Sequence, residues 1–192
     1  NMGHEGATED AGIFEARVRR VKGMLATLFL SHGVPMLLAG DEMGQTQGGN
    51  NNAYCQDNET TWIDWEAARP ELVEAVAALT ALRREWRTHL APYGFWPRPE
   101  ATETIWLHPE GRDMSQQDWR DGGLFAVGMR HHQEEGPDIL VLVNAGEDCT
   151  FTLPSGGWEL ILDTARDPVV CAEDPGARLT VEAQSVAVLR AV

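Results

Sequence analysis

Residues 34–58, VPMLLAGDEMGQTQGGNNNAYCQDN, give the clearest indication of the fold. It opens with a short, almost continuous apolar run and then becomes rich in Gly, Asn and Gln. Such a run is typical of a strand that is buried on both faces, as in a parallel sheet. Pro35 lies at the start of the run, where a missing N–H donor is tolerated. The sequence therefore predicts a buried parallel strand over Val34–Ala39, followed by a long polar loop from about Asp41 to Asp64.

Two amphipathic helices flank this strand and loop. The first is predicted to begin after Thr8 as its N-cap and to end at Gly33, with Lys22 off its apolar stripe. That stripe consists of Ile13, Val21, Met24, Leu25, Leu28 and Phe29. The second helix is predicted to have Pro70 in its first turn and to run to about Arg87, with Arg83 facing water. This order of elements is that of a (β/α) repeat, and one strand cannot complete a sheet by itself.

After Pro92 the pattern changes to short alternating segments that are separated by Gly- and Pro-containing turns. The predicted strands are Thr104–His108, Leu124–Arg130, Ile139–Asn144, Cys149–Leu153, Trp158–Asp163, Arg178–Val181 and Val186–Arg190. Strands about ten residues apart with alternating apolar positions are typical of an antiparallel β-sandwich. The expected organisation is therefore an α/β part, residues 1–90, followed by an all-β domain, residues 91–192.

Composition excludes several classes of partner. The formal net charge of −15 argues against nucleic acid and against an anionic membrane surface. No segment approaches the roughly 20 apolar residues that span a bilayer. The three cysteines, Cys55, Cys149 and Cys171, are odd in number and far apart, which favours a reducing, cytoplasmic location without a disulfide scaffold. The histidines lack metal-ligand spacing, so neither a metal nor another cofactor is expected.

The polar loop carries the side chains best suited to bind a sugar. Amides, carboxylates and the Tyr54 phenol can hydrogen-bond to hydroxyl groups, and Tyr54 or Trp62 can cover an apolar sugar face. Composition alone favours a loop whose Asn side chains bind their own backbone. Calcium is a further alternative, although the spacing is not that of an EF-hand. Asp41 and Glu42 are consecutive and diverge, so they are not expected to be the paired carboxylates of a glycosidase.

Several segments resemble the bacterial glycogen-debranching enzymes, the isoamylase-type members of the α-amylase superfamily. They are GHEG (3–6), LATL (25–28), SHGVPMLLAGDE (31–42), GNNNAYCQDN (49–58), WLHPEGRDM (106–114), DW (118–119) and SVAVLR (185–190). The resemblance spans nearly the whole chain, and the run NNNAYCQDN is highly specific. It implies the C-terminal portion of a (β/α)8 barrel, with helix 7, strand 8, a long active-site loop and helix 8, followed by the β-sandwich.

The resemblance also implies a function. Family members hydrolyse α-1,6 branch linkages of glycogen and limit dextrin with retention of configuration. Their catalytic Asp, Glu and Asp lie on barrel strands four, five and seven, so we expect no catalytic residue here and an N-terminal part of the enzyme that precedes Asn1. The isolated chain is expected to be inactive. The positions that match the family and are expected to line or support the glucan cleft are Asp41, Glu42, Asn50, Asn51, Asn52, Tyr54, Asp57 and, more weakly, His4.

Two other functions compete with this interpretation. The β-domain can be a non-catalytic α-glucan-binding module that uses exposed Trp residues such as Trp96 or Trp158. It can also be a structural domain that shields the barrel, which we favour because burial is the commoner fate of Trp. Trp62 and Trp65 are the Trp residues closest to the polar loop.

Overall fold

A computed structural model describes residues 1–90, 102–133 and 136–192. Residues 91–101 lie outside the described residues. The predicted domain boundary near residue 90 adjoins this range, and the candidate Trp96 falls within it. The helices are α1 (Ala11–Leu30), α2 (Pro70–Glu85) and α3 (Arg87–Leu90), with short 3-10 helices η1 (Asp41–Met43) and η2 (Asp118–Arg120). The strands are β1 (Thr102–Leu107), β2 (Ala126–Gln133), β3 (Ile139–Asn144), β4 (Cys149–Thr152), β5 (Trp158–Asp163), β6 (Val170–Glu173), β7 (Arg178–Val181) and β8 (Ser185–Ala191).

The strands form two antiparallel sheets. Six strands pair in the order β1-β2-β3-β8-β5-β6, and β4 pairs with β7 in a second sheet. The large sheet contributes side chains to an apolar cluster on each of its faces. Successive residues of β3 belong to these two clusters in turn, because neighbouring residues of a strand point to opposite faces. Leu140 and Leu142 pack toward Phe151 of β4, whereas Ile139 and Val141 pack toward the helices. The predicted antiparallel strands are confirmed, and β3, β5 and β7 have the predicted bounds.

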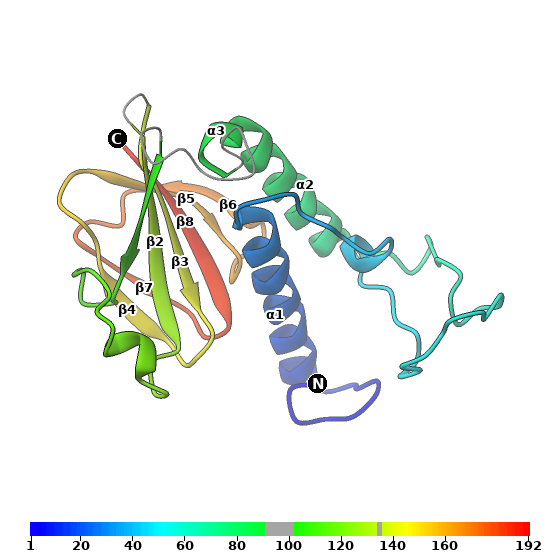
Figure 1. The fold of residues 1–192 in the computed structure, drawn as a ribbon. Coiled ribbons are helices and arrows are strands. Elements are labelled where there is room, and N and C mark those ends of the chain that lie inside the picture. The colour runs from blue at the N-terminus through cyan, green and yellow to red at the C-terminus, as the bar shows by residue number, and fades with distance from the viewer. Residues whose placement is uncertain (91–101, 134–135) are drawn as a thin grey trace.

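The helices cover the other face of the large sheet (Figure 1). Leu25, Phe29 and Leu79 belong to one apolar cluster with Val141 and other sheet residues. Helix α1 approaches β8 closely at Gly23, because a Cβ added there would lie 3.0 Å from the carbonyl oxygen of Gln184, immediately before β8. The helical part and the β part are therefore joined by a continuous core in the described part of the chain.

The helix boundaries differ from the prediction in ways that capping explains. Asp10, not Thr8, is the N-cap of α1, and its carboxylate accepts a hydrogen bond from the Ile13 N–H at 3.1 Å. The helix ends at Leu30 rather than at Gly33, and the N–H of the C-cap residue Ser31 donates to the Thr27 carbonyl. Pro70 does begin α2, as predicted, because the first turn of a helix needs no N–H donor.

Two side chains of α1 lie where the apolar stripe did not predict them. Met24 was assigned to the stripe, but it is 66% exposed. Lys22, the single lysine of the sequence, was placed off the stripe, but it is buried. Its Nζ donates to the Arg166 carbonyl at 3.2 Å and lies 3.7 Å from an Asp167 carboxylate oxygen. A long side chain can bury its stem and still bring its charge to polar partners.

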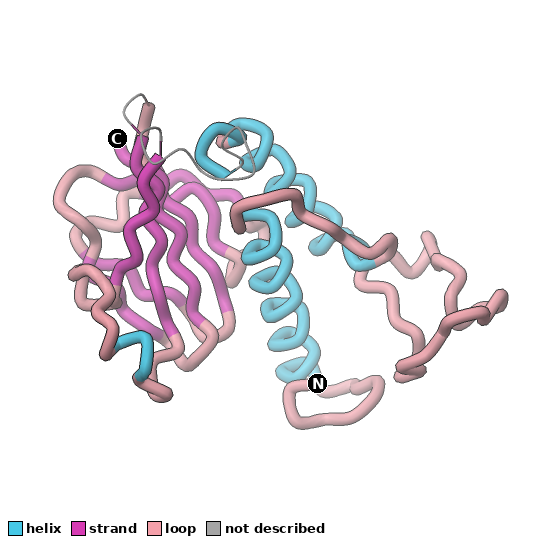
Figure 2. The backbone as a smooth tube through the Cα atoms, in the orientation of Figure 1, coloured by secondary structure: helices cyan, strands magenta, loops and turns pink. Residues whose placement is uncertain are grey.

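The predicted buried strand over Val34–Ala39 is not formed in this structure. The segment belongs to no sheet, and Val34, Met36 and Leu38 are 91%, 86% and 67% exposed. The physical reason is that a parallel strand needs neighbouring strands, and no segment of the described residues lies beside it as a pairing partner. Figure 2 shows it as a loop that runs from the end of α1 across α2. Strand β6, in contrast, was missed, because Val170–Glu173 is short and mostly exposed.

Candidate functional site

The long polar loop is anchored at its first residues against the start of α2. Helix η1 lies between Gly40 and Gly44, whose φ angles of 101° and 75° are in the left-handed region that favours glycine. A Cβ on Gly44 would lie 2.9 Å from Leu72 Cδ1, so the backbone passes directly over α2. The Arg69 N–H donates to the Met43 carbonyl at 3.1 Å, and the Met43 side chain is buried. The base of the loop is therefore held firmly.

Asp41 and Glu42 lie on η1 and have different surroundings. The Glu42 carboxylate accepts a hydrogen bond from the Gly40 N–H at 2.9 Å, which stabilises the tight turn that enters η1. Asp41 is exposed and lines a groove between α1 and the base of the loop. Glu42 is not among the residues that line that groove. The structure therefore gives the two carboxylates separate tasks, as their consecutive positions suggested.

The segment Asn50–Asp57 extends away from the helices and the sheet (Figure 2). Its side-chain hydrogen bonds are local: Asn50 Oδ1 accepts from the Asn52 N–H at 3.0 Å, and Asp57 Oδ1 accepts from Trp62 Nε1 at 2.9 Å. Asn51 is exposed, and Tyr54 is 87% exposed. None of these side chains lines the groove. The structure thus does not bring these residues together with Asp41, and their assignment to a glucan site stays a prediction.

His4 lies in an N-terminal loop that wraps around the Arg17 side chain. The guanidinium of Arg17 donates to the carbonyl oxygens of Asn1 at 2.9 Å, of Gly6 at 2.7 Å and of His4. A ring nitrogen of His4 lies 3.1 Å from the Ala7 carbonyl oxygen, and the imidazole does not line the groove. Arg17 therefore fixes this loop, a role that the sequence did not suggest because arginines beside an apolar stripe were expected to face solvent.

The groove itself has a volume of about 840 Å³ and is open to solvent. The apolar part of its lining includes Met24, Leu28 and Leu37, and the polar part includes Arg20, Gln45 and Arg69. Of the predicted site residues, Asp41 alone contributes to the lining. In the described part of the chain, no three His, Cys, Asp or Glu side chains gather in an arrangement that could hold a metal ion. Neither long helix there has the continuous apolar length that a membrane span requires.

Arg83 ties the end of α1 to α2 and so fixes the point where the Val34–Ala39 segment starts. Its guanidinium donates to the Ser31 carbonyl at 2.9 Å and also to the carbonyls of Phe29 and Gly33. A charged donor satisfies carbonyl groups that the last turn of a helix leaves without intrahelical partners. Arg83 was expected to face water, and it is instead partly buried against α1. Only the folded contact between the helices reveals this role.

His32 follows α1 and contacts the sheet. Its Nε2 lies 3.3 Å from Nδ1 of the buried His131 in β2, and the two ring centroids are 5.0 Å apart. Burial, followed by the positive charge of Arg83, holds the pKa of His32 below its usual range. A protonated His32 would place a cation between Arg83 and a second imidazole, so the folded chain favours the neutral ring.

Acidification is expected to lower the stability of the chain through His32. Because the folded chain binds the His32 proton more weakly than the unfolded chain does, this stability is present above about pH 6.5 and is lost as the pH falls below it. Urea unfolding at about pH 7.5 and about pH 5.5 measures the difference, which His32→Gln is expected to reduce. His108→Gln is the control, since the ring of His108 contacts Glu110 and not His32 or Arg83. An unchanged pH dependence in His32→Gln would refute the assignment.

Comparison with known proteins adds the decisive observation. The chain is 42% identical over 164 residues to a glycogen debranching enzyme of Pectobacterium carotovorum, a match that covers 83% of this chain. The chain is homologous to the glycogen debranching enzymes. It is also 38% identical over 181 residues to the glycogen debranching enzyme of Yersinia pseudotuberculosis, which covers 94% of this chain. These matches cover 23% and 26% of the relatives, so the chain spans about a quarter of the length of the glycogen debranching enzymes that it matches.

The fold agrees with solved structures of pullulanases. A pullulanase from Anoxybacillus sp. LM18-11, solved with maltotetraose, superposes with a TM-score of 0.65 at 17% identity, covering 92% of this chain and 24% of that protein. The pullulanase from Bacillus acidopullulyticus gives a TM-score of 0.62 at 18% identity, covering 96% of this chain and 21% of that protein. At such identities the likeness concerns the fold alone. No protein-family profile matches the chain.

Proposed function

We propose that this chain is part of a glycoside hydrolase that cleaves α-1,6 branch linkages of glycogen or limit dextrin with retention of configuration. The observation that carries the proposal is the identity of 38–42% to glycogen debranching enzymes over most of the chain. In this proposal the chain supplies the loop Asp41–Asp64 and the β-sandwich. The catalytic carboxylates belong to polypeptide outside the chain.

The chemistry of retention supports this division of labour. A retaining glycosidase needs two carboxyl groups about 5 Å apart that face one anomeric carbon. Asp41 lines the groove while the Glu42 carboxylate is occupied by the Gly40 N–H, so these neighbours do not form such a pair. The amides of Asn50, Asn51 and Asn52 are exposed and offer donors and acceptors to sugar hydroxyls. These residues can orient a glucan, but they cannot form the covalent intermediate.

The exposed segment Val34–Ala39 supports the proposal that the chain completes a (β/α)8 barrel. Leu37 packs against the cluster between the helices and the sheet, whereas Val34, Met36 and Leu38 are left facing solvent. A segment that is apolar on both sides favours burial between two neighbouring strands and the barrel helices. We propose that strands from outside the chain flank it and that the Asp41–Asp64 loop then lies at the carboxyl edge of the barrel, where such enzymes build their sites.

The test is complementation. The chain alone is expected to release no reducing ends from glycogen limit dextrin. Joined to the part of the Pectobacterium carotovorum relative that it does not match, it is expected to restore debranching to a rate near that of the intact relative. The same part of the relative without this chain is the control. Debranching by the isolated, homogeneous chain, or a chimaera that folds but does not debranch, would contradict the proposal.

A structural role for the β-sandwich is the second candidate function. The shared cluster that joins α1 and α2 to the large sheet favours it, because removal of the sheet would expose the apolar faces of both helices. The two roles are compatible, since the same chain can shield helices and carry a site loop.

A further inference from the structure

Two tryptophans of the β part remain exposed. Trp106 on β1 is 40% exposed and Trp119 on η2 is 55% exposed. Their ring centroids are 5.4 Å apart, and the ring planes are inclined by 80°. Trp158, the Trp suggested by sequence for glucan binding, is instead buried, and its Nε1 donates to the Pro154 carbonyl at 2.9 Å. Trp106 and Trp119 are therefore the described aromatic pair of the β part that could meet a ligand.

The position of Trp106 explains why it is exposed. The pairing of β1, β2, β3 and β8 places Trp106, Met129, Val141 and Val188 in one row across the sheet. Residues directly opposite each other share a face, so this row lies on the face that the helices cover. Val188 and Val141 are buried under the helices, whereas Trp106 lies on the edge strand beyond them. The row therefore begins with buried valines under the helices and ends with the exposed ring of Trp106 on the edge strand.

The loop that carries Trp119 is held rigidly. Arg112 donates two hydrogen bonds to the Asp118 carboxylate, at 2.6 and 2.9 Å, and the N–H and hydroxyl of Ser115 each donate to it at 2.7 Å. These bonds, that of Arg112 first, hold the pKa of Asp118 well below its usual range. The Met114 N–H also donates to the Trp106 carbonyl at 2.9 Å. A loop with this many internal bonds presents an exposed ring without a further loss of conformational freedom on binding.

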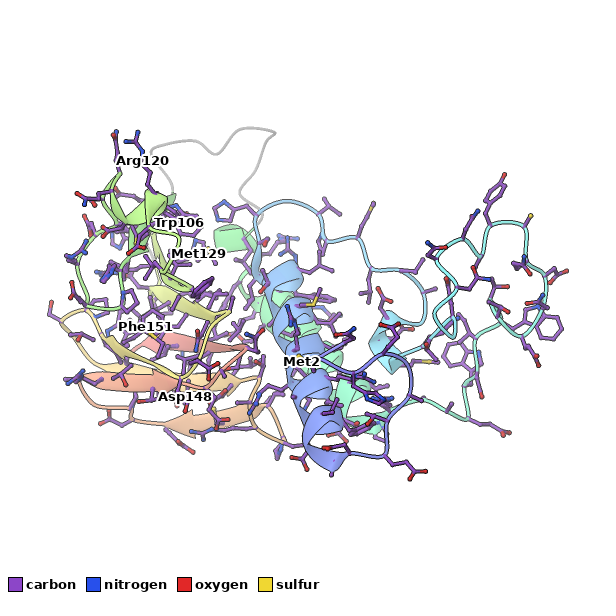
Figure 3. The ribbon with its side chains drawn as sticks, turned by 90° about the horizontal axis from the view of Figure 1, so that it is seen from below. Met2, Trp106, Arg120, Met129, Asp148 and Phe151 are labelled. Atoms are coloured by element: carbon purple, nitrogen blue, oxygen red, sulfur yellow. The ribbon has the colours of Figure 1, made fainter. Side chains whose placement is uncertain are left out.

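A polar hollow of about 600 Å³ adjoins the base of η2. It is lined by Arg112, Ser115, Gln117, Asp118, Arg120 and Asp121. These side chains include both donors and acceptors and both signs of charge, which suits a neutral, hydroxyl-rich ligand better than an anion. Figure 3, which labels Trp106 and Arg120, places this side of the β part away from the polar loop. A ligand here would therefore be separate from the groove beside Asp41.

We propose that Trp106, Trp119 and the adjoining hollow form a surface site for a short run of α-1,4-linked glucose units. The choice of sugar rests on the proposed function, and the aromatic and polar groups identify a carbohydrate. Sugar rings present C–H groups on their faces, which pack on an aromatic ring, while their hydroxyls reach polar neighbours. The inclined rings suit a chain that curves, as α-1,4-glucan does, rather than a flat β-1,4-linked ribbon. A site remote from catalysis would hold a large branched polymer while its branch points are processed.

The test is the retardation of the 192-residue chain in native gels that contain glycogen. The wild type is expected to be retarded, and Trp119→Ala is expected to weaken the apparent affinity about 5- to 10-fold. Trp65→Ala is the comparison variant: Trp65 is 70% exposed and lies beside the polar loop, so this variant reports binding through that loop instead. Trp119→Phe keeps an aromatic face and is expected to retain most of the binding. Maltoheptaose, and not cellohexaose, is expected to compete.

Four outcomes would overturn the site: an unretarded wild type, equal retardation of wild type and Trp119→Ala, a loss confined to Trp65→Ala, or light scattering that shows a dimer dispersed by Trp119→Ala. The last result would identify a second copy of the chain as the occupant. Thermal unfolding of each variant verifies that the fold is intact. Failure here is distinct from failure of the proposed function, because complementation measures hydrolysis and these gels measure binding by the chain alone.

Discussion

Replacing Gly23 by Val is expected to lower the free energy of unfolding by about 2 to 3 kcal/mol, the effect of overfilling a closely packed contact. Gly23 is buried in the middle of α1, and an added Cβ alone would lie 3.0 Å from the Gln184 carbonyl oxygen and 3.6 Å from Ser185 Cα. These atoms are backbone, so they cannot move aside as a flexible side chain can. The two methyl groups of Val would force α1 away from β8 and open the cluster around Leu25 and Phe29.

Met24→Val is the matched control for this experiment. It introduces the same β-branched residue at the next position of α1, where the side chain is 66% exposed. Urea unfolding of the three proteins measures the difference, with equal dependence on urea concentration verifying that the same surface is exposed. Equal stability of Gly23→Val and Met24→Val would contradict the close approach of α1 to β8.

The close contact between α1 and β8 bears on how the chain functions. Lys22 and Gly23 both face the β part, and the buried side chains of Leu25, Ala26, Phe29 and Leu30 continue that interface. The end of α1 is then fixed to α2 by Arg83. The sheet therefore determines where the Val34–Ala39 segment starts, and through it where the Asp41–Asp64 loop begins. The β part therefore has a structural effect on the loop that requires no chemistry of its own.

The β part was the most predictable from sequence. Strands such as β3 and β5 alternate between two apolar environments and are bounded by Gly and Pro turns, so local pattern and tertiary packing agree. β6 was missed because a short, exposed edge strand lacks that pattern. The two ends of α1 differ from the prediction because several residues could cap each end. Asp10 is the N-cap in place of Thr8, and Ser31 is the C-cap before Gly33, and sequence alone does not rank these residues.

The candidate site was less predictable, for two different reasons. The loop was recognisable by its composition, but composition does not show which of its side chains come together. In the structure Asp41 lines the groove, whereas Asn50–Asp57 do not. Arg17 and Arg83 were missed because a guanidinium that caps backbone carbonyls looks, in sequence, the same as one that faces water. The buried strand predicted over Val34–Ala39 has the right composition but no partner among the described residues.

The role of the segment Asn50–Asp57 is tested by exchanging it for a Gly- and Ser-rich segment of equal length in the complemented enzyme. Its contacts are local and its side chains are largely exposed, so the unfolding temperature of the chain is expected to change little. If the segment lines the glucan cleft, kcat/KM for limit dextrin is expected to fall by about 100-fold, since loss of orientation alone has effects of that size. Replacing the exposed turn at Asp174–Ala177 by the same kind of segment is the control and is expected to leave kcat/KM unchanged. An enzyme that debranches limit dextrin at the unaltered rate without Asn50–Asp57 would show that this segment does not line the glucan cleft.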